Sequence, residues 1–217
     1  MEIKILYDNQ SKNGYKNGWG FSSLINTPKS KILFDTGWNG NILLYNMKVA
    51  GIRLEEIDKI VLSHQHWDHI GGINHLLEHI NPDIYLGKSF SLNLKNELGK
   101  RSNLIEVSET TQIAENVWTT GELGDKIKEQ SLIFETDEGL IIVTGCAHPG
   151  LESIIKKSES LGEIHAIIGG FHDFDDLKIL KDIPLIVPCH CTSKKEEIKK
   201  IYPESTKECK AGTIFKF

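Results

Sequence analysis

The decisive stretch of this sequence is Ser63-His64-Gln65-His66-Trp67-Asp68-His69-Ile70-Gly71-Gly72. It follows an apolar run at residues 60–62 and precedes a pattern of apolar residues at helical spacing. This order predicts a buried strand, a polar loop and then a helix. Within six residues the loop carries four side chains able to bind a metal ion, namely His64, His66, Asp68 and His69.

The spacing of these four side chains favours a metal site. His64 and His66 are two residues apart, so an extended backbone points both imidazoles to the same side. Asp68 and His69 follow where the chain turns, and they can face the same point from another direction. Imidazole nitrogen and carboxylate oxygen suit zinc, manganese or iron. The alternative is a polar loop whose histidines cap the helix, but a cap needs one polar residue and not four.

Composition limits the class of protein. The 217 residues are enough for one large domain, and 39% hydrophobic and 25% charged residues are typical of a soluble globular protein. The net charge is −5 and no basic stripe is present, so we expect no nucleic-acid partner. The longest apolar runs have five or six residues, which excludes a membrane-spanning helix. The sequence begins directly with a strand pattern, so no signal peptide is expected.

Four cysteines occur, at positions 146, 189, 191 and 209. In a chain of this size they do not indicate a disulfide framework. For each of them we favour a small buried residue beside a strand end over a metal ligand. A reducing cytoplasm is the compartment that fits this usage best.

The rest of the chain alternates strands and helices. Strands are predicted at 1–7 (an edge or half-buried strand), 21–26, 31–34, 59–62, 83–86, 116–120, 130–135, 140–143, 165–168, 185–187 and 213–217, with a helix and a strand between 87 and 112. Further helices are predicted at 41–50, 73–80, 151–158 and 194–200. Five apolar strands end in a polar residue: Asp35, His64, His148, His172 and His190. Because open α/β architectures bind ligands at the carboxyl ends of strands, these positions predict one common site.

Two smaller features have competing interpretations. His75 and His79 are four residues apart in the predicted helix and can in principle bind a metal, but a solvated helix face is the favoured interpretation. Residues 121–128 form a loop with glycine and charged residues. This loop either covers the active site or is an ordinary exposed loop.

The decisive stretch resembles the His-x-His-x-Asp-His signature of the metallo-β-lactamase superfamily, here followed by Gly-Gly and a helix. The resemblance implies an α/β (α+β) fold, a four-layer αββα sandwich, formed by a single domain over residues 1–217. It also implies one or two metal ions at one edge between the sheets. The strand, His-containing loop, glycine and helix recur at 140–158, which agrees with a fold of two pseudo-equivalent halves.

The resemblance also implies roles for individual residues. Two divalent metal ions are expected, zinc first, with manganese or iron as alternatives. The implied ligands are His64, His66 and His148 for the first ion, and Asp68, His69 and His190 for the second. Cys146 stands where the superfamily often has a bridging aspartate, so either its thiolate or water alone would bridge. Asp35 would support the metal loop, although a turn or a helix cap explains it equally well.

The implied function is a metal-dependent hydrolase. The metal ions would activate water to attack a phosphoester or related ester of a small, phosphorylated substrate. Asp68 would orient that water or accept its proton, and His172 would face the substrate. The motifs at 144–150, 169–172 and 188–192 resemble a subfamily that includes a dihydropterin-type synthase, so alkyl transfer with release of pyrophosphate is the alternative. A redox metal protein is a third alternative, but the ligand-loop glutamate and flavin domain usual in such relatives are not seen.

Overall fold

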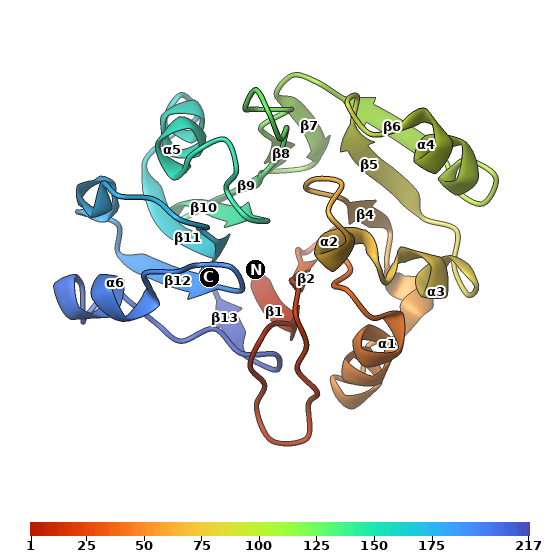
Figure 1. Cartoon of the computed structure of the whole chain (residues 1–217), viewed down its shortest axis with the longest axis horizontal. Helices are drawn as coiled ribbons and strands as arrows, with labels where there is room; N and C mark the ends of the chain where they lie inside the picture. Colours follow the sequence, from red (N-terminus) through yellow and green to blue (C-terminus); the bar gives the residue numbers. More distant parts are fainter. The chain divides into compact units, whose positions relative to one another are not determined.

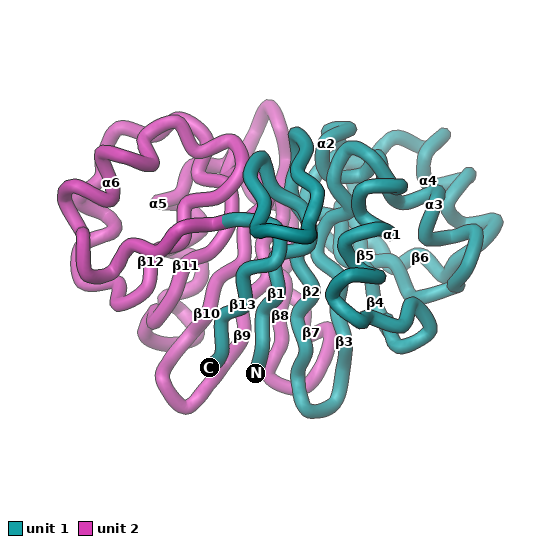
Figure 2. Tube along the Cα trace, turned by 90° about the horizontal axis from the view of Figure 1, so that it is seen from below, with its two compact units in different colours: residues 1–108, 210–217 teal, residues 109–209 magenta.

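The computed structural model describes all residues from 1 to 217. The chain forms two compact units, shown in two colours in Figure 2. Unit 1 contains residues 1–108 and 210–217, and unit 2 contains residues 109–209. None of the helices combines the length and the apolar character that crossing a bilayer requires. The single domain expected over residues 1–217 stays a prediction.

Unit 1 is built on a mixed sheet of seven strands in the order β13-β1-β2-β3-β4-β5-β6. Its strands are β1 (Glu2–Tyr7), β2 (Ser22–Asn26), β3 (Lys31–Phe34), β4 (Lys59–Val61), β5 (Asp83–Gly87), β6 (Leu104–Val107) and β13 (Ile214–Lys216). The strands β3 to β6 run parallel to one another, so their carboxyl ends lie at one edge. Of the two alternatives predicted for strand 1–7, the half-buried strand agrees with the burial pattern of β1, and the edge strand is wrong because β13 pairs with the outer side of β1.

Helices cover one face of this sheet. They are α1 (Gly40–Val49), α2 (Trp67–Ile70), α3 (Ile73–Leu77) and α4 (Leu92–Leu98), with a 3₁₀ turn η1 at Leu54–Glu56. Leu43 of α1, Leu76 of α3 and Leu98 of α4 share one hydrophobic cluster with strand residues such as Leu33 and Ile60. In Figure 1, α1 and α3 lie next to each other and contact one another. The apolar side of each helix therefore packs on the sheet and holds the loops between them in place.

Unit 2 is built on a second mixed sheet of six strands in the order β12-β11-β10-β9-β8-β7. Its strands are β7 (Thr111–Ala114), β8 (Val117–Thr119), β9 (Leu132–Thr136), β10 (Gly139–Thr144), β11 (Ile164–Gly170) and β12 (Leu185–Cys189). The strands β10, β11 and β12 run parallel, whereas β9 returns antiparallel to β10. The carboxyl ends of the three parallel strands again lie at one edge.

The helices of unit 2 are α5 (Leu151–Glu159) and α6 (Lys195–Ile201), with a 3₁₀ segment η2 at Leu177–Leu180. Leu151 and Ile154 of α5 and Ile198 of α6 share a hydrophobic cluster with Ile142 of β10 and Ile167 of β11. The helix α5 contacts β11 (Figure 1). Each unit thus repeats the predicted sequence of strand, polar loop and helix.

Candidate metal site

The ligand loop of unit 1 begins where β4 ends. The strand β4 runs beside β3 in parallel, with Val61 opposite Phe34. This register brings Asp35, the first residue after β3, next to the loop that follows β4. His64 lies in the loop, His66 precedes the first turn of α2, and Asp68 and His69 lie within α2.

Asp35 is the anchor of this loop. Its side chain is fully buried. One carboxylate oxygen, Oδ1, accepts a hydrogen bond of 2.7 Å from the backbone N–H of Ser63. The other oxygen, Oδ2, accepts from the Ser63 hydroxyl at 2.7 Å and from Nδ1 of His69 at 2.6 Å. Asp35 therefore supports the metal loop and caps no helix; the cap of α1 is Asn39.

These contacts determine the tautomers of two histidines. A carboxylate only accepts hydrogen bonds, so the proton of neutral His69 is on Nδ1. The Ser63 hydroxyl gives its one proton to Asp35 and therefore accepts from Nδ1 of His64, which lies 2.9 Å away. In both rings Nε2 then carries the lone pair, which is the form in which imidazole binds a metal ion.

The spacing within the loop fits a metal ion. Nε2 of His64 lies 3.0 Å from Nδ1 of His66, and the rings of His64 and His69 are 4.2 Å apart between centroids. Two imidazole nitrogens that share a tetrahedral zinc ion at about 2.0–2.1 Å lie about 3.3 Å apart. The carboxylate of Asp68 adds an oxygen 3.9 Å from Nε2 of His69. The donor set of unit 1 therefore fits a divalent cation.

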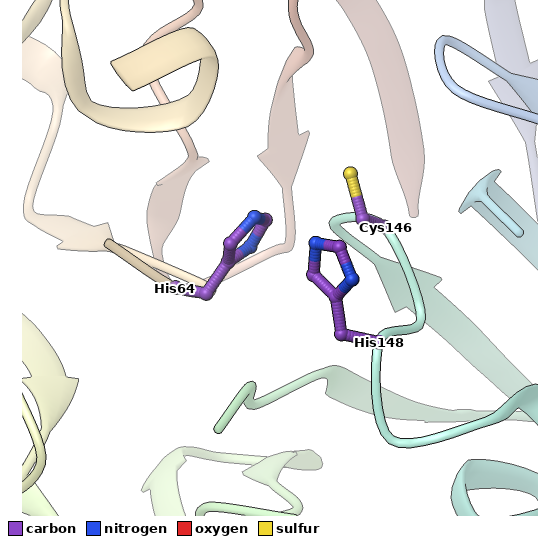
Figure 3. Close-up of side chains that lie close together, drawn as sticks. All are labelled: His64, Cys146 and His148. Carbon is purple, nitrogen blue, oxygen red and sulfur yellow. The ribbon is translucent and has the colours of Figure 1, made fainter. Parts of the chain in front are cut away.

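Unit 2 carries the remaining predicted ligands at the carboxyl ends of its parallel strands. Cys146 and His148 project from the loop after β10, and Figure 3 shows both side chains, together with His64 of the unit 1 loop. His172 follows β11 and His190 follows β12. Sγ of Cys146 lies within 4.8 Å of a ring nitrogen of His148 and also of one of His190. The exposed ring of His172 lies 4.8 Å from that of His148 between centroids.

Glu129 is a residue of this site that the sequence reasoning missed. Its buried carboxylate accepts four backbone hydrogen bonds from the loop after β10. Oε1 accepts from Gly145, Cys146 and Ala147 at 3.1, 2.8 and 2.9 Å, and Oε2 accepts from His148 at 3.0 Å. Glu129 therefore supports the loop of unit 2 as Asp35 supports the loop of unit 1.

The register of one hairpin contains the signal for Glu129. The strands β9 and β10 pair antiparallel, with Leu132 opposite Val143. Three further steps along each strand place Glu129 opposite Cys146. A carboxylate at that position, three residues before the apolar strand β9 begins at Leu132, is the feature that identifies it from sequence.

The backbone is strained at several of these strand ends. Asp35, Ala147, His172 and His190 have φ angles of 57°, 59°, 48° and 39°, although none of them is glycine. Such left-handed conformations cost free energy and occur where the surrounding structure enforces them, often at functional sites. Their presence at the carboxyl ends of strands in both units supports a functional role for these loops.

The prediction of a solvated helix face at His75 and His79 is confirmed for one of the two histidines and wrong for the other. His79 is exposed, as expected. His75 is instead half-buried against the start of α1, where a Cβ added to Gly40 would meet its ring at 2.3 Å. The sequence pattern did not show that α1 and α3 approach so closely at a glycine.

The loop at 121–128, for which the sequence left two interpretations open, is closed by backbone hydrogen bonds between Leu123 and Glu129.

An aromatic cavity of about 400 Å³ lies in unit 1, lined by Tyr7, Trp19, Trp38, Asn39 and Ile42. More than half of the surface of Trp19 and of Trp38 is exposed. Burial raises the pKa of the Tyr7 phenol, so it stays neutral at physiological pH. The cavity borders the ligand loop, because a Cβ added to Gly71 would lie 2.2 Å from the backbone oxygen of Trp38, one of the lining residues.

Known proteins with similar sequences and similar structures place the chain in a family. A synthase of Methanocaldococcus jannaschii, named 7,8-dihydropterin-6-methyl-4-(β-D-ribofuranosyl)-aminobenzene-5′-phosphate synthase, is 30% identical over 91% of this chain and 90% of its own. A crystal structure described as a metal-dependent hydrolase of the β-lactamase superfamily matches with a TM-score of 0.84 and 27% identity, covering 100% of this chain and 99% of its own.

A second solved structure, the metallo-β-lactamase fold protein YhfI from Bacillus subtilis, has a TM-score of 0.75 and 15% identity, and the match covers 99% of each chain. These likenesses confirm the predicted fold class. The family model described as the metallo-beta-lactamase superfamily matches residues 18–155. The chain therefore belongs to the metallo-β-lactamase superfamily and has its fold.

Proposed function

We propose that this protein is a metal-dependent hydrolase that acts on a phosphoester or related ester of a small molecule. In this proposal the ligands of both units serve one dinuclear centre, as the superfamily signature implies. The six ligands are His64, His66, Asp68, His69, His148 and His190. The observation that carries the proposal is the Asp35 network, which leaves the Nε2 lone pair of both His64 and His69 in metal-binding form.

The donor set favours zinc. Imidazole nitrogens predominate among the six ligands, and imidazole suits zinc and iron better than magnesium or calcium. Manganese or iron remains the alternative. Two divalent cations held by these ligands would lower the pKa of a bound water and polarise the bond under attack.

Two further side chains have roles toward the substrate. The half-buried carboxylate of Asp68 orients the attacking water and accepts its proton. The exposed imidazole of His172, beside His148, donates a hydrogen bond to a phosphate or a developing oxyanion. A phosphorylated small molecule, and not a nucleic acid, is the proposed substrate, since the chain has a net charge of −5.

A matched pair of exposed histidines tests the proposal. His66→Ala should reduce bound metal and abolish phosphoesterase activity, with little loss of stability because His66 is exposed. His79→Ala, which changes an exposed histidine on the end of a helix, should leave both unchanged. Bound metal is measured by elemental analysis, and activity with a panel of phosphomonoesters and phosphodiesters. Full metal content and full activity in the His66 variant would overturn the assignment.

The second candidate is a synthase that transfers an alkyl group and releases pyrophosphate. It is supported by the archaeal relative, a dihydropterin-type synthase by name, and by the aromatic cavity of Tyr7, Trp19 and Trp38, whose rings suit stacking on a planar heterocycle. Incubation with a hydroxymethyl-dihydropterin diphosphate and an aryl amine distinguishes the two. Release of pyrophosphate with coupling of the amine identifies a synthase. Hydrolysis of phosphoesters without coupling identifies the hydrolase.

A further inference from the structure

Two of the four cysteines come together in unit 2 from different parts of the sequence. Cys189 is the last residue of β12, and Cys209 lies in the segment that follows α6. Their sulfur atoms lie within 4.8 Å of each other. Both are reduced thiols in this structure. Neither belongs to the six proposed metal ligands, so the proposed function gives this pair no role.

The pairing of the two segments explains why the thiols meet. The segment around Thr206 runs parallel to β12, with Thr206 opposite Ile186. The backbone of Ile186 makes two hydrogen bonds of 2.9 Å to the neighbours of Thr206. Three further steps along each segment lead to Cys189 and Cys209. Neighbouring strands lie about 4.7–4.9 Å apart, which is within the Cα separation of about 4.4–6.8 Å that a disulfide spans.

We propose that Cys189 and Cys209 are a modification site at which a peroxide forms a reversible disulfide. This inference goes beyond the proposed function and does not depend on it. Cys209 is 6% exposed and Cys189 is fully buried, so the oxidant reaches Cys209 first. The sulfur of Cys209 attacks a peroxide oxygen, the O–O bond breaks, and a sulfenic acid and water form.

The second thiol completes the reaction. The sulfur of Cys189 attacks the sulfur of the sulfenic acid, the S–O bond breaks, and the oxygen leaves as water. Two thiols and one hydrogen peroxide therefore give one disulfide and two water molecules. A thiol reductant reverses the step by thiol–disulfide exchange.

The chain next to the pair allows this closure. Pro188 has no N–H, so it cannot donate the next hydrogen bond of the ladder that begins at Ile186. The residues after Lys207 are therefore held less tightly to β12. They can shift by the small distance that an S–S bond of about 2.05 Å requires. The thiol of Cys189 donates only one weak hydrogen bond, to the carbonyl oxygen of Val187 at 3.3 Å, and loses little when it is oxidised.

The test treats the full-length chain, as purified, with hydrogen peroxide and maps the thiols by alkylation, trypsin digestion and mass spectrometry without reduction. The chains compared are wild type, Cys209→Ser and Cys191→Ser. Trypsin leaves Cys189 and Cys191 together in the peptide 182–194, and Cys209 in the peptide 208–210. The Cys191 variant therefore assigns the bond to Cys189. Circular dichroism verifies that each variant is folded.

Cys191 is also a matched control for reactivity. Its thiol is only half-buried and lies 3.9 Å from the carbonyl oxygen of Cys146. Oxidation governed by exposure alone would modify Cys191 first, whereas oxidation governed by proximity joins Cys189 to Cys209.

The proposal predicts a cross-linked peptide pair in wild type and in Cys191→Ser, which disappears after treatment with dithiothreitol. Because the bond closes a loop of about 20 residues around α6, oxidised wild type should also unfold at a midpoint roughly 4–16 °C higher than reduced wild type. Cys209→Ser should show neither effect. Wild type without a cross-linked peptide, a cross-link that is lost in Cys191→Ser, or an equal rise of the midpoint in Cys209→Ser would overturn the proposal. None of these results bears on the proposed metal centre, which metal content and activity test separately.

Discussion

Glu129 offers the most direct test of how the ligand loop of unit 2 is held. Its buried carboxylate accepts four backbone hydrogen bonds, and replacement by alanine would leave three buried N–H groups and the part-buried N–H of His148 without an acceptor. Each unsatisfied buried donor costs about 1–3 kcal/mol, so even the lower value for the three buried donors gives a loss of about 3 kcal/mol in the free energy of unfolding. Because the whole free energy of unfolding of such a domain is only about 5–15 kcal/mol, Glu129→Ala should lose a large share of its stability.

The isosteric change Glu129→Gln removes the negative charge of the side chain and keeps its shape. Glutamine keeps one acceptor oxygen for Gly145, Cys146 and Ala147, but its amide N–H₂ then faces the N–H of His148. The loss of one bond and the contact between two donors should cost about 1–3 kcal/mol. The control is Glu135→Gln on the same hairpin, where the side chain is exposed and the change should stay within about 0.5 kcal/mol.

Urea denaturation of the metal-free chains, followed by circular dichroism, measures these differences. Metal-free protein is used so that a change in ligand affinity does not add to the change in stability. Equal unfolding free energies for Glu129→Gln, Glu135→Gln and wild type would refute the claim that this carboxylate holds the loop.

Two further predictions concern the loop of unit 1. Asp35→Asn places an amide donor opposite Nδ1 of His69, which favours the tautomer that leaves no lone pair on Nε2. Metal affinity, measured by competition titration, should fall by about 10–100-fold. An affinity equal to that of wild type would contradict the tautomer argument. Gly20→Ala puts a Cβ 2.4 Å from the backbone oxygen of Asp68 at a φ of +134°, so thermal unfolding should show a loss beyond the roughly 1–3 kcal/mol of backbone strain alone. Gly14→Ala, with a φ of +88° and open space around it, should show only the strain, and an equal loss in both variants would refute the steric argument.

Local patterns were sufficient for most of the secondary structure, whereas the fold class was predicted from the resemblance of residues 63–72 to the superfamily signature. The strand at 31–34 and the helix near 41–50 were predicted because apolar spacing and turn residues act within a few positions. For strand 1–7 the local pattern left an edge strand and a half-buried strand open, and only the half-buried strand is found, since β1 pairs with β13 from the other end of the chain. No local pattern contains a contact between residues so far apart.

The support of the ligand loops depends on neighbours in space. Asp35 acts on Ser63 and His69 across the parallel pair β3 and β4, a contact over 28 and 34 residues, so the sequence left a helix cap as an equal alternative. Glu129 was missed, although the hairpin register places it opposite Cys146. In both cases the burial of the carboxylate shows its role. A buried carboxylate needs hydrogen-bond donors around it, and here the ligand loop provides them.

The central claim is a dinuclear metal centre, and its most direct test is the metal content of the purified chain. Elemental analysis is applied to protein prepared without chelator and without affinity nickel. The proposed function predicts close to two zinc, manganese or iron atoms per chain. One atom per chain, or none, would contradict the two-metal centre and the hydrolytic chemistry derived from it.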